Sequence, residues 1–265
     1  MSVLKKLLIK ISGNKFSQKL LHKRIKSSQF LMGIGSGSNV NYSGEKAIFD
    51  VLSNKCKTPY CIFDVGANKG QFLGLILRNL AGDDFDVHCF EPSATAFHSL
   101  KENSPEDERI TLNNIGLGKA KSEMLLHYDN PGSGLASLTK RKLYHYDIDF
   151  SKSEKVLIDT VDNYCQEKGV KRINLLKIDV EGHELDVLAG ASNMFNSKLV
   201  DIVTFEFGGC NIDTRSFFQD FYYFFQDVGM KISRITPSGY LYPIDSYKEI
   251  CEQFRTTNFL ATIES

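Results

Sequence analysis

The spacing of apolar positions changes several times along the chain. Short apolar runs typical of buried strands occur between residues 60 and 263, and stretches with apolar residues every three or four positions lie between them. The predicted strands are Tyr60–Val65, Val87–Phe90, Ile110–Ile115, Glu123–Tyr128, Lys155–Ile158, Ile173–Val180, Leu199–Phe207, Lys231–Thr236 and Asn258–Ile263. Strands that alternate with helices predict an α/β fold, with a mostly parallel, seven-stranded sheet and helices on both faces.

The first 44 residues follow a different pattern. Apolar residues of one helical face, with lysines mostly between them, predict a short basic amphipathic helix; these are Val3, Leu4, Leu7, Leu8 and Ile11. Residues 1–44 hold eight basic residues and no acidic one, whereas the rest of the chain holds 24 basic and 32 acidic residues. Gly33–Gly44 is rich in Gly, Ser and Asn and is predicted to be a linker. We therefore divide the chain into a basic helical extension with its linker (1–44) and one folded domain (45–265).

The extension has two interpretations. A basic amphipathic helix can lie on an anionic membrane surface, which would give peripheral membrane contact through residues 1–28. It can equally pack on its own domain or on a second subunit of a homo-oligomer. The sequence alone leaves both open.

Bulk composition narrows the class of protein. The 265 residues, 42% of them hydrophobic, can form a core without metals or disulfides. The six cysteines show no CxxC pair and no zinc-ligand spacing, which favours reduced thiols in a cytosolic protein. No apolar run approaches the roughly 20 residues of a membrane span. The zero net charge gives no indication of a nucleic-acid partner. We expect a cytoplasmic protein, at the inner face of the membrane if the extension binds lipid.

A glycine loop follows the first strand of the domain. Asp64, Gly66, Asn68 and Gly70 form an Asp-x-Gly-x-Asn-x-Gly pattern ahead of a predicted helix, and the GxGxxG spacing of a pyrophosphate site is absent. An acid before the loop would repel a pyrophosphate but could hold an ammonium group. S-adenosylmethionine carries an ammonium, a carboxylate and a sulfonium but no phosphate, so we predict it as the cofactor.

Two further strand ends complete the predicted cofactor site. Glu91 follows the second strand, where a carboxylate can accept hydrogen bonds from both ribose hydroxyls. Asn114 lies near the end of the third strand, and its amide suits an adenine edge. Ligands of open α/β sheets bind beyond these strand ends.

These residues resemble those of the FkbM methyltransferase family. The resemblance covers about residues 60–210 and rests on four segments, of which the last is the most family-specific: Phe63–Gly70, Phe90–Pro92, Asn114–Gly118 and Lys177–Ala191. It implies a Rossmann-like methyltransferase fold for residues 45–265. It also implies transfer of a methyl group to a hydroxyl, usually of a sugar or a secondary metabolite. Gly116 stands where the family more often has alanine.

The reacting end is predicted at the fourth and fifth strand ends of the cofactor-binding sheet. Methyl transfer to a hydroxyl needs an aligned acceptor and a base, and His183 is the leading candidate for that base. Asp179 is expected to contact the cofactor and to orient the acceptor or serve as the base, and Glu206 to bind acceptor hydroxyls or orient His183. The alternative is that Glu181 and His183 only cap the helix that follows. For Glu184 a structural role is favoured.

Other functions stay open at this point. A divalent metal on Asp179, Glu181 and Glu206 would polarise a sugar diol, but we do not favour it. The partner is expected to be a glycan, a glycan precursor or another small molecule. A nicotinamide-dependent oxidoreductase and a non-catalytic assembly module are the competing functions.

Overall fold

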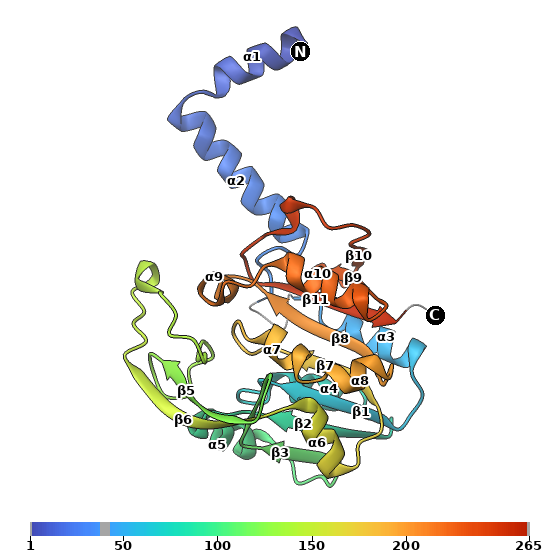
Figure 1. Cartoon of the computed structure of the whole chain (residues 1–265). Helices are drawn as coiled ribbons and strands as arrows, with labels where there is room; N and C mark the ends of the chain where they lie inside the picture. Colours follow the sequence, from blue (N-terminus) through green and yellow to red (C-terminus); the bar gives the residue numbers. More distant parts are fainter. Residues whose placement is uncertain (1, 38–42, 264–265) are drawn as a thin grey trace.

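A large twisted sheet forms the centre of the molecule in the computed structural model, which describes residues 2–37 and 43–263 (Figure 1). Its eight strands run in the order β10-β9-β11-β8-β7-β1-β2-β3. Their bounds are β1 Tyr60–Val65, β2 Phe85–Phe90, β3 Ile110–Asn113, β7 Ile173–Ile178, β8 Val200–Phe207, β9 Met230–Ile235, β10 Leu241–Pro243 and β11 Thr257–Ile263. Pairing is parallel between neighbours in the run β3, β2, β1, β7 and β8. It is antiparallel where β11 joins β8 and where β9 and β10 follow β11. The order reverses between β1 and β7, and ligands of such sheets bind at that point.

Helices cover both faces of this sheet, because successive strand residues point to opposite sides. Ile62 packs on the face covered by α3 (Ala47–Lys55), α4 (Gln71–Asn79) and α5 (Ala94–Asn103). Its neighbour Phe63 packs on the other face, which is covered by α6 (Val161–Lys168), α7 (Glu184–Ala189), α8 (Ser192–Asn196) and α10 (Phe218–Asp227). The predicted α/β fold with two helical layers is therefore confirmed.

The strand count differs from the prediction in two ways. The large sheet has eight strands instead of seven, because the short β10 forms a hairpin with β9 at the edge. The predicted strands 123–128 and 155–158 do form, as parts of β5 (Ser122–Tyr128) and β6 (Lys152–Asp159), but they join β4 (Gly116–Leu117) in a separate three-stranded sheet. Strand partners are chosen by contacts distant in sequence, which local periodicity does not report.

The connection between β5 and β6, residues 129–151, leaves the small sheet and returns to it. Its short helix η1 (Tyr144–Tyr146) is exposed, whereas Leu143 and Phe150 on either side are buried. We call this segment the β5–β6 loop. Two other short elements belong to the body: α9 (Cys210–Thr214) follows β8, and η2 (Glu249–Cys251) precedes β11.

The N-terminal helices form an arm that projects from the body (Figure 1). They are α1 (Val3–Ser12) and α2 (Lys15–Leu31). No helix in residues 2–37 or 43–263 is both long and apolar enough to cross a bilayer.

The body begins before the predicted boundary at residue 44. Ile34 and Ser36 are buried, and the backbone N–H groups of Gly35 and Gly37 both donate to the Thr256 carbonyl oxygen, at 3.0 and 3.1 Å. Residues 33–37 of the predicted linker thus pack on the domain, and residues 38–42 lie outside the described chain.

Candidate active site

A cavity of about 830 Å³ opens beyond the carboxyl ends of β1, β2, β7 and β8. Its walls come from the β1–α4 loop, the β7–α7 turn, the end of β8, the β5–β6 loop and the segment that contains Gly35 and Gly37. Its lining carries more acidic than basic side chains, namely Glu45, Glu91, Asp179, Glu181 and Glu206 against Arg141, Lys177 and Arg255. A ligand with a positively charged group suits this balance.

The β1–α4 loop lies against the β7 end. Gly66 has φ +83°, and a Cβ at this position would lie 1.8 Å from the Asp179 carbonyl oxygen, so only glycine fits. Asn68 also has positive φ and lines the cavity, and its buried Oδ1 accepts no hydrogen bond from the residues described. The loop therefore brings its backbone to the cavity, with the unpaired Asn68 amide oxygen buried within it.

Glu91 sits at the end of β2 with its carboxylate held in place. Its Oε2 accepts from the Asn68 backbone N–H and its Oε1 from that of Ser93, both at 2.9 Å. Burial raises the pKa of Glu91 to about 7, although these hydrogen bonds oppose the change. Each oxygen keeps a second acceptor position, so the group suits a ribose diol.

A buried lysine links two of the predicted acidic residues. The Lys177 Nζ lies 3.5 Å from Asp64 Oδ1 and 3.3 Å from Asp179 Oδ2. Burial opposes the charge on Lys177, but the carboxylates of Asp179, Asp64 and Glu45 raise its pKa above the usual value. Asp64 is fully buried behind the cavity wall, and neither of its oxygens accepts a well-formed hydrogen bond within the described chain. The ammonium group of Lys177 is therefore the counter-ion of the Asp64 carboxylate.

Glu206, near the end of β8, lines the cavity beside the end of the neighbouring strand β7, which Asp179 follows. Its carboxylate forms no hydrogen bond or ion pair within residues 2–37 and 43–263. Burial, with the charges of Asp179 and Glu181, raises the pKa of Glu206 well above its usual range. Such a group is available for a proton or a ligand hydroxyl.

His183 lines the cavity but both of its ring nitrogens are occupied. Nδ1 lies 2.8 Å from Asp186 Oδ2, and Nε2 lies 2.9 Å from Thr139 Oγ1. Since a carboxylate only accepts, Nδ1 donates to Asp186, and the Thr139 hydroxyl, which can donate or accept, is the partner of Nε2. His183 precedes α7 without a side-chain cap. Glu184 is fully buried and accepts from the Gly182 N–H, in agreement with the structural role favoured for it.

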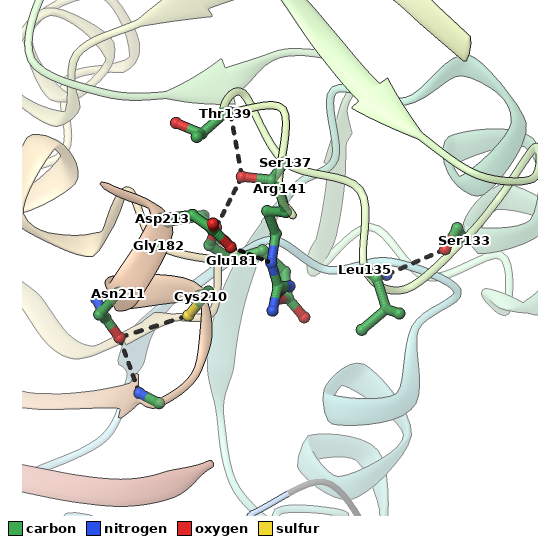
Figure 2. A network of polar contacts seen from close by, with 12 residues as sticks. Ser133, Leu135, Ser137, Thr139, Arg141, Glu181, Gly182, Cys210, Asn211 and Asp213 are labelled. Carbon is green, nitrogen blue, oxygen red and sulfur yellow. Dashed lines mark hydrogen bonds and ion pairs between the residues drawn. The ribbon is translucent and has the colours of Figure 1, made fainter. Parts of the chain in front are cut away.

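The β5–β6 loop lines the cavity and makes polar contacts with the β7–α7 turn (Figure 2). Ser137 Oγ donates to the Glu181 carbonyl oxygen at 2.8 Å, and Arg141 forms an ion pair with the Glu181 carboxylate. Asp213 of α9 lies 3.8 Å from Arg141 Nε. Burial and the Asp179 charge raise the pKa of Glu181 to about 8, against the effect of Arg141.

The structure brings most of the predicted site residues to one cavity. Those in its lining are Gly66, Asn68, Glu91, Asp179, His183 and Glu206. Gly70, in the left-handed region, starts α4 outside the cavity, and Asp64 lies behind the wall. Asn114 is not brought to the cavity either, because its amide donates to the carbonyl oxygens of Glu91 and Pro92 at 2.9 and 3.1 Å. It braces the β2 end instead.

Several lining residues were not predicted from the sequence. Arg141, Arg255 and Glu45 come from segments with no glycine motif, strand end or catalytic spacing to mark them. Lys177 lies within the family-specific segment, two residues before Asp179. That spacing places both side chains on the same side of a strand, and it was the signal that could have marked Lys177 as a site residue.

The donor set fits S-adenosylmethionine. Asn68 carries an amide oxygen without a hydrogen-bond partner in the described chain, Glu91 offers a buried carboxylate, and the lining is acidic overall. Among the described residues, no group of three or more His, Cys, Asp or Glu side chains could hold a metal ion.

Comparison with known proteins agrees with this geometry. A profile of the methyltransferase FkbM domain matches residues 64–232. The 2-O-methyltransferase NoeI of Sinorhizobium fredii is 26% identical over 63% of this chain and 71% of its own length. The hexuronic acid methyltransferase AglP of Haloferax volcanii is 27% identical over 62% of this chain and 64% of its own. The 31-O-demethyl-FK506 methyltransferase FkbM of Streptomyces tacrolimicus is 26% identical over 50% and 59%.

The profile covers well over half of the chain, and it includes the glycine loop, Glu91, the β7 end and Glu206. The chain therefore belongs to the FkbM family of S-adenosylmethionine-dependent methyltransferases.

Proposed function

We propose that this chain is an O-methyltransferase whose acceptor is a sugar hydroxyl of a glycan or glycan precursor. The observation that carries the proposal is the arrangement of one cavity, with Glu91 held for a ribose on one side and the unpartnered Glu206 on the other. The names of two relatives, a 2-O-methyltransferase and a hexuronic acid methyltransferase, support a sugar acceptor.

Four residues would hold the cofactor. Glu91 would accept hydrogen bonds from the ribose hydroxyls, and the backbone of Gly66 and Asn68 would line the amino-acid end. The Asp179 carboxylate, 40% exposed at the β7 end, would face the ammonium group. Asp64 acts indirectly, because it holds Lys177 and so limits how much of the Asp179 charge is neutralised. When bound, S-adenosylmethionine supplies a methyl group on a positively charged sulfur.

Glu206 is the better candidate for the base. Methyl transfer to an alcohol releases one proton, and the carboxylate of Glu206 is placed in the cavity without a partner among the described residues. Its raised pKa means that the ionised carboxylate, once formed, is a stronger base than that of an ordinary glutamate. The neighbouring Asp179 would keep the acceptor oriented.

His183 then serves as a positioning residue. Its ring joins Asp186 on α7 to Thr139 on the β5–β6 loop, and so it holds that loop against the β7–α7 turn. An acceptor hydroxyl can reach Nε2 only if Thr139 moves away from it. The prediction from the sequence that His183 is the base is thus replaced, in this proposal, by Glu206.

The proposal is tested in two steps. Isothermal titration should show binding of S-adenosylmethionine and none of NAD, whereas tight binding of NAD alone would point to the oxidoreductase. A panel of glycans and small hydroxylated metabolites is then incubated with isotopically labelled methyl donor and read by mass spectrometry. Label on a sugar oxygen supports the acceptor class; label only on a non-sugar metabolite, as the relative that acts on an FK506 precursor suggests, would replace it.

Glu206→Gln tests the base. We expect turnover to fall by about 10²–10⁴-fold while cofactor affinity is kept. His183→Ala should lower turnover less and should raise the KM for the acceptor, because the loop loses its contact. If His183→Ala removes activity and Glu206→Gln does not, the roles are the reverse of those proposed.

A further inference from the structure

The N-terminal arm exposes an unusual number of large apolar side chains. Helix α2 buries no residue, and α1 and α2 leave the body (Figure 1). The exposed apolar residues, each between 41% and 78% accessible, are Leu7, Leu8, Ile9, Ile11, Phe16, Leu20, Leu21, Ile25, Phe30 and Leu31. An apolar surface of this extent marks an interaction site. Apart from its base, the arm does not pack on its own domain, which leaves an anionic membrane surface and a second subunit as the possible partners of the extension.

The charge of the arm indicates what covers it. Its eight basic residues have no acidic residue among them, whereas residues 45–265 carry eight more acidic than basic residues. Basic residues beside apolar ones are the combination that binds the headgroups and acyl chains of an anionic bilayer. We propose that the arm docks on an anionic lipid surface, with the acidic body held away from it.

The first helix has the geometry for this contact. Leu7 and Ile11, one helical turn apart, share a face of α1. Ile9, two residues from each, lies on the opposite side, near Lys5 and Lys6. One face of α1 can therefore enter the acyl region while its lysines reach the headgroups.

The arm is braced at its bend. Asn14 caps α2, and its Nδ2 donates to the Ile11 carbonyl oxygen at 2.8 Å, while Gln18 Nε2 donates to that of Ser12 at 2.9 Å. These bonds hold α1 at an angle to α2, so α1 can lie along a surface while α2 leads back to the body.

The base of the arm is fixed to the body and the cavity. Gln29 of α2 bonds to Gln253 at 2.8 Å and accepts from Arg255 Nη1 at 2.7 Å, and Arg234 Nε donates to the Met32 carbonyl oxygen at 2.7 Å. Arg255 lines the cavity. Docking would thus set the orientation of the cavity relative to the lipid surface.

A second copy of the chain is the competing occupant. Two arms side by side would bring like charges together, which disfavours that pairing. An arm placed on the acidic body of another copy would have favourable charge, so the experiment measures association as well as lipid binding.

The test is sedimentation of the full chain with vesicles of phosphatidylcholine alone or mixed with phosphatidylglycerol. We expect binding only to the anionic vesicles, weakened by salt. Ile11→Gln should reduce the partition coefficient by about tenfold or more. Ile9→Gln is the matched control, because both isoleucines are 55% exposed and only their faces differ, and it should change binding little. Replacing Lys5, Lys6 and Lys10 with glutamine should cost about fivefold for each charge.

Absence of binding to anionic vesicles would overturn the proposal. So would equal effects of the two isoleucine variants, because the apolar face would then have no role. A dimer in analytical ultracentrifugation that Ile11→Gln dissociates, without vesicle binding, would assign the arm to a second copy. None of these results depends on S-adenosylmethionine, so they are independent of the proposed function.

Discussion

Replacement of Lys177 by methionine should destabilise the fold by about 3–5 kcal/mol at neutral pH, because it leaves a buried carboxylate without its counter-ion. Methionine keeps most of the packing of the lysine stem. Asp64 is fully buried, and Lys177 at 3.5 Å is its only ion-pair partner within the described chain. Asp179 is 40% exposed, so water can solvate it once the lysine is gone, and most of the loss should come from Asp64.

A double-mutant cycle that combines Lys177→Met with Asp64→Asn isolates the interaction between Asp64 and Lys177. In an Asp64→Asn background the buried carboxylate that Lys177 pairs with is absent, so the effect of Lys177→Met should fall to less than about 2 kcal/mol. The effect should also depend on pH. Burial raises the pKa of Asp64 in the folded state, so its ionisation destabilises the fold as pH rises from about 3.9, the unfolded value, through the higher folded value. The loss in Lys177→Met is therefore full at high pH and shrinks in acid.

Urea unfolding followed by far-ultraviolet circular dichroism measures these free energies, since the chain contains no tryptophan for fluorescence. The four proteins of the cycle are compared at neutral pH and at about pH 5. A loss below about 1 kcal/mol, or the same loss with Asn at position 64, would refute the reasoning and show that Asp64 is not ionised in the fold.

Three further outcomes follow from the site. Since the pKa of Glu91 is about 7, the affinity for S-adenosylmethionine should rise with pH through neutrality. Glu91→Gln should weaken binding about tenfold and remove this pH dependence. Calorimetry measures both, and a wild-type affinity that does not change with pH would contradict the prediction. Gly66→Ala should lower the free energy of unfolding by at least about 2 kcal/mol, because the added Cβ would meet the Asp179 carbonyl oxygen. Gly82→Ala is the control, because a Cβ there has nothing within 4 Å, and it should leave the melting temperature almost unchanged. A chelator should leave turnover unchanged, and loss of activity restored by magnesium or manganese would bring back the metal hypothesis.

Local sequence patterns were sufficient for much of the fold. The seven longer strands of the large sheet appear where apolar runs predict them, because a strand buried on both faces needs apolar residues along its length. Parallel strands end at one edge of the sheet, so Glu91, Asp179 and Glu206 could be placed together from the sequence.

Partners beyond local reach could not be predicted in the same way. Residues 123–128 and 155–158 have ordinary strand patterns, and only the packing of the whole chain puts them in a second sheet. Asn114 has the right residue type and position for an adenine edge, yet its amide is taken by the backbone after β2. A hydrogen-bonding group binds whichever partner the fold brings near it.

By itself, the amino-acid order determined the chemistry of this protein: an acidic glycine loop without a pyrophosphate spacing, carboxylates at strand ends, and a basic apolar N-terminus. Tertiary structure alone decided how these groups are used. It occupied both nitrogens of His183, left Glu206 without a partner in the described chain, and brought Arg141 over the β7–α7 turn. The reason is physical: residue type and spacing report what a group can do, whereas its protonation and availability depend on neighbours that lie far away in the sequence.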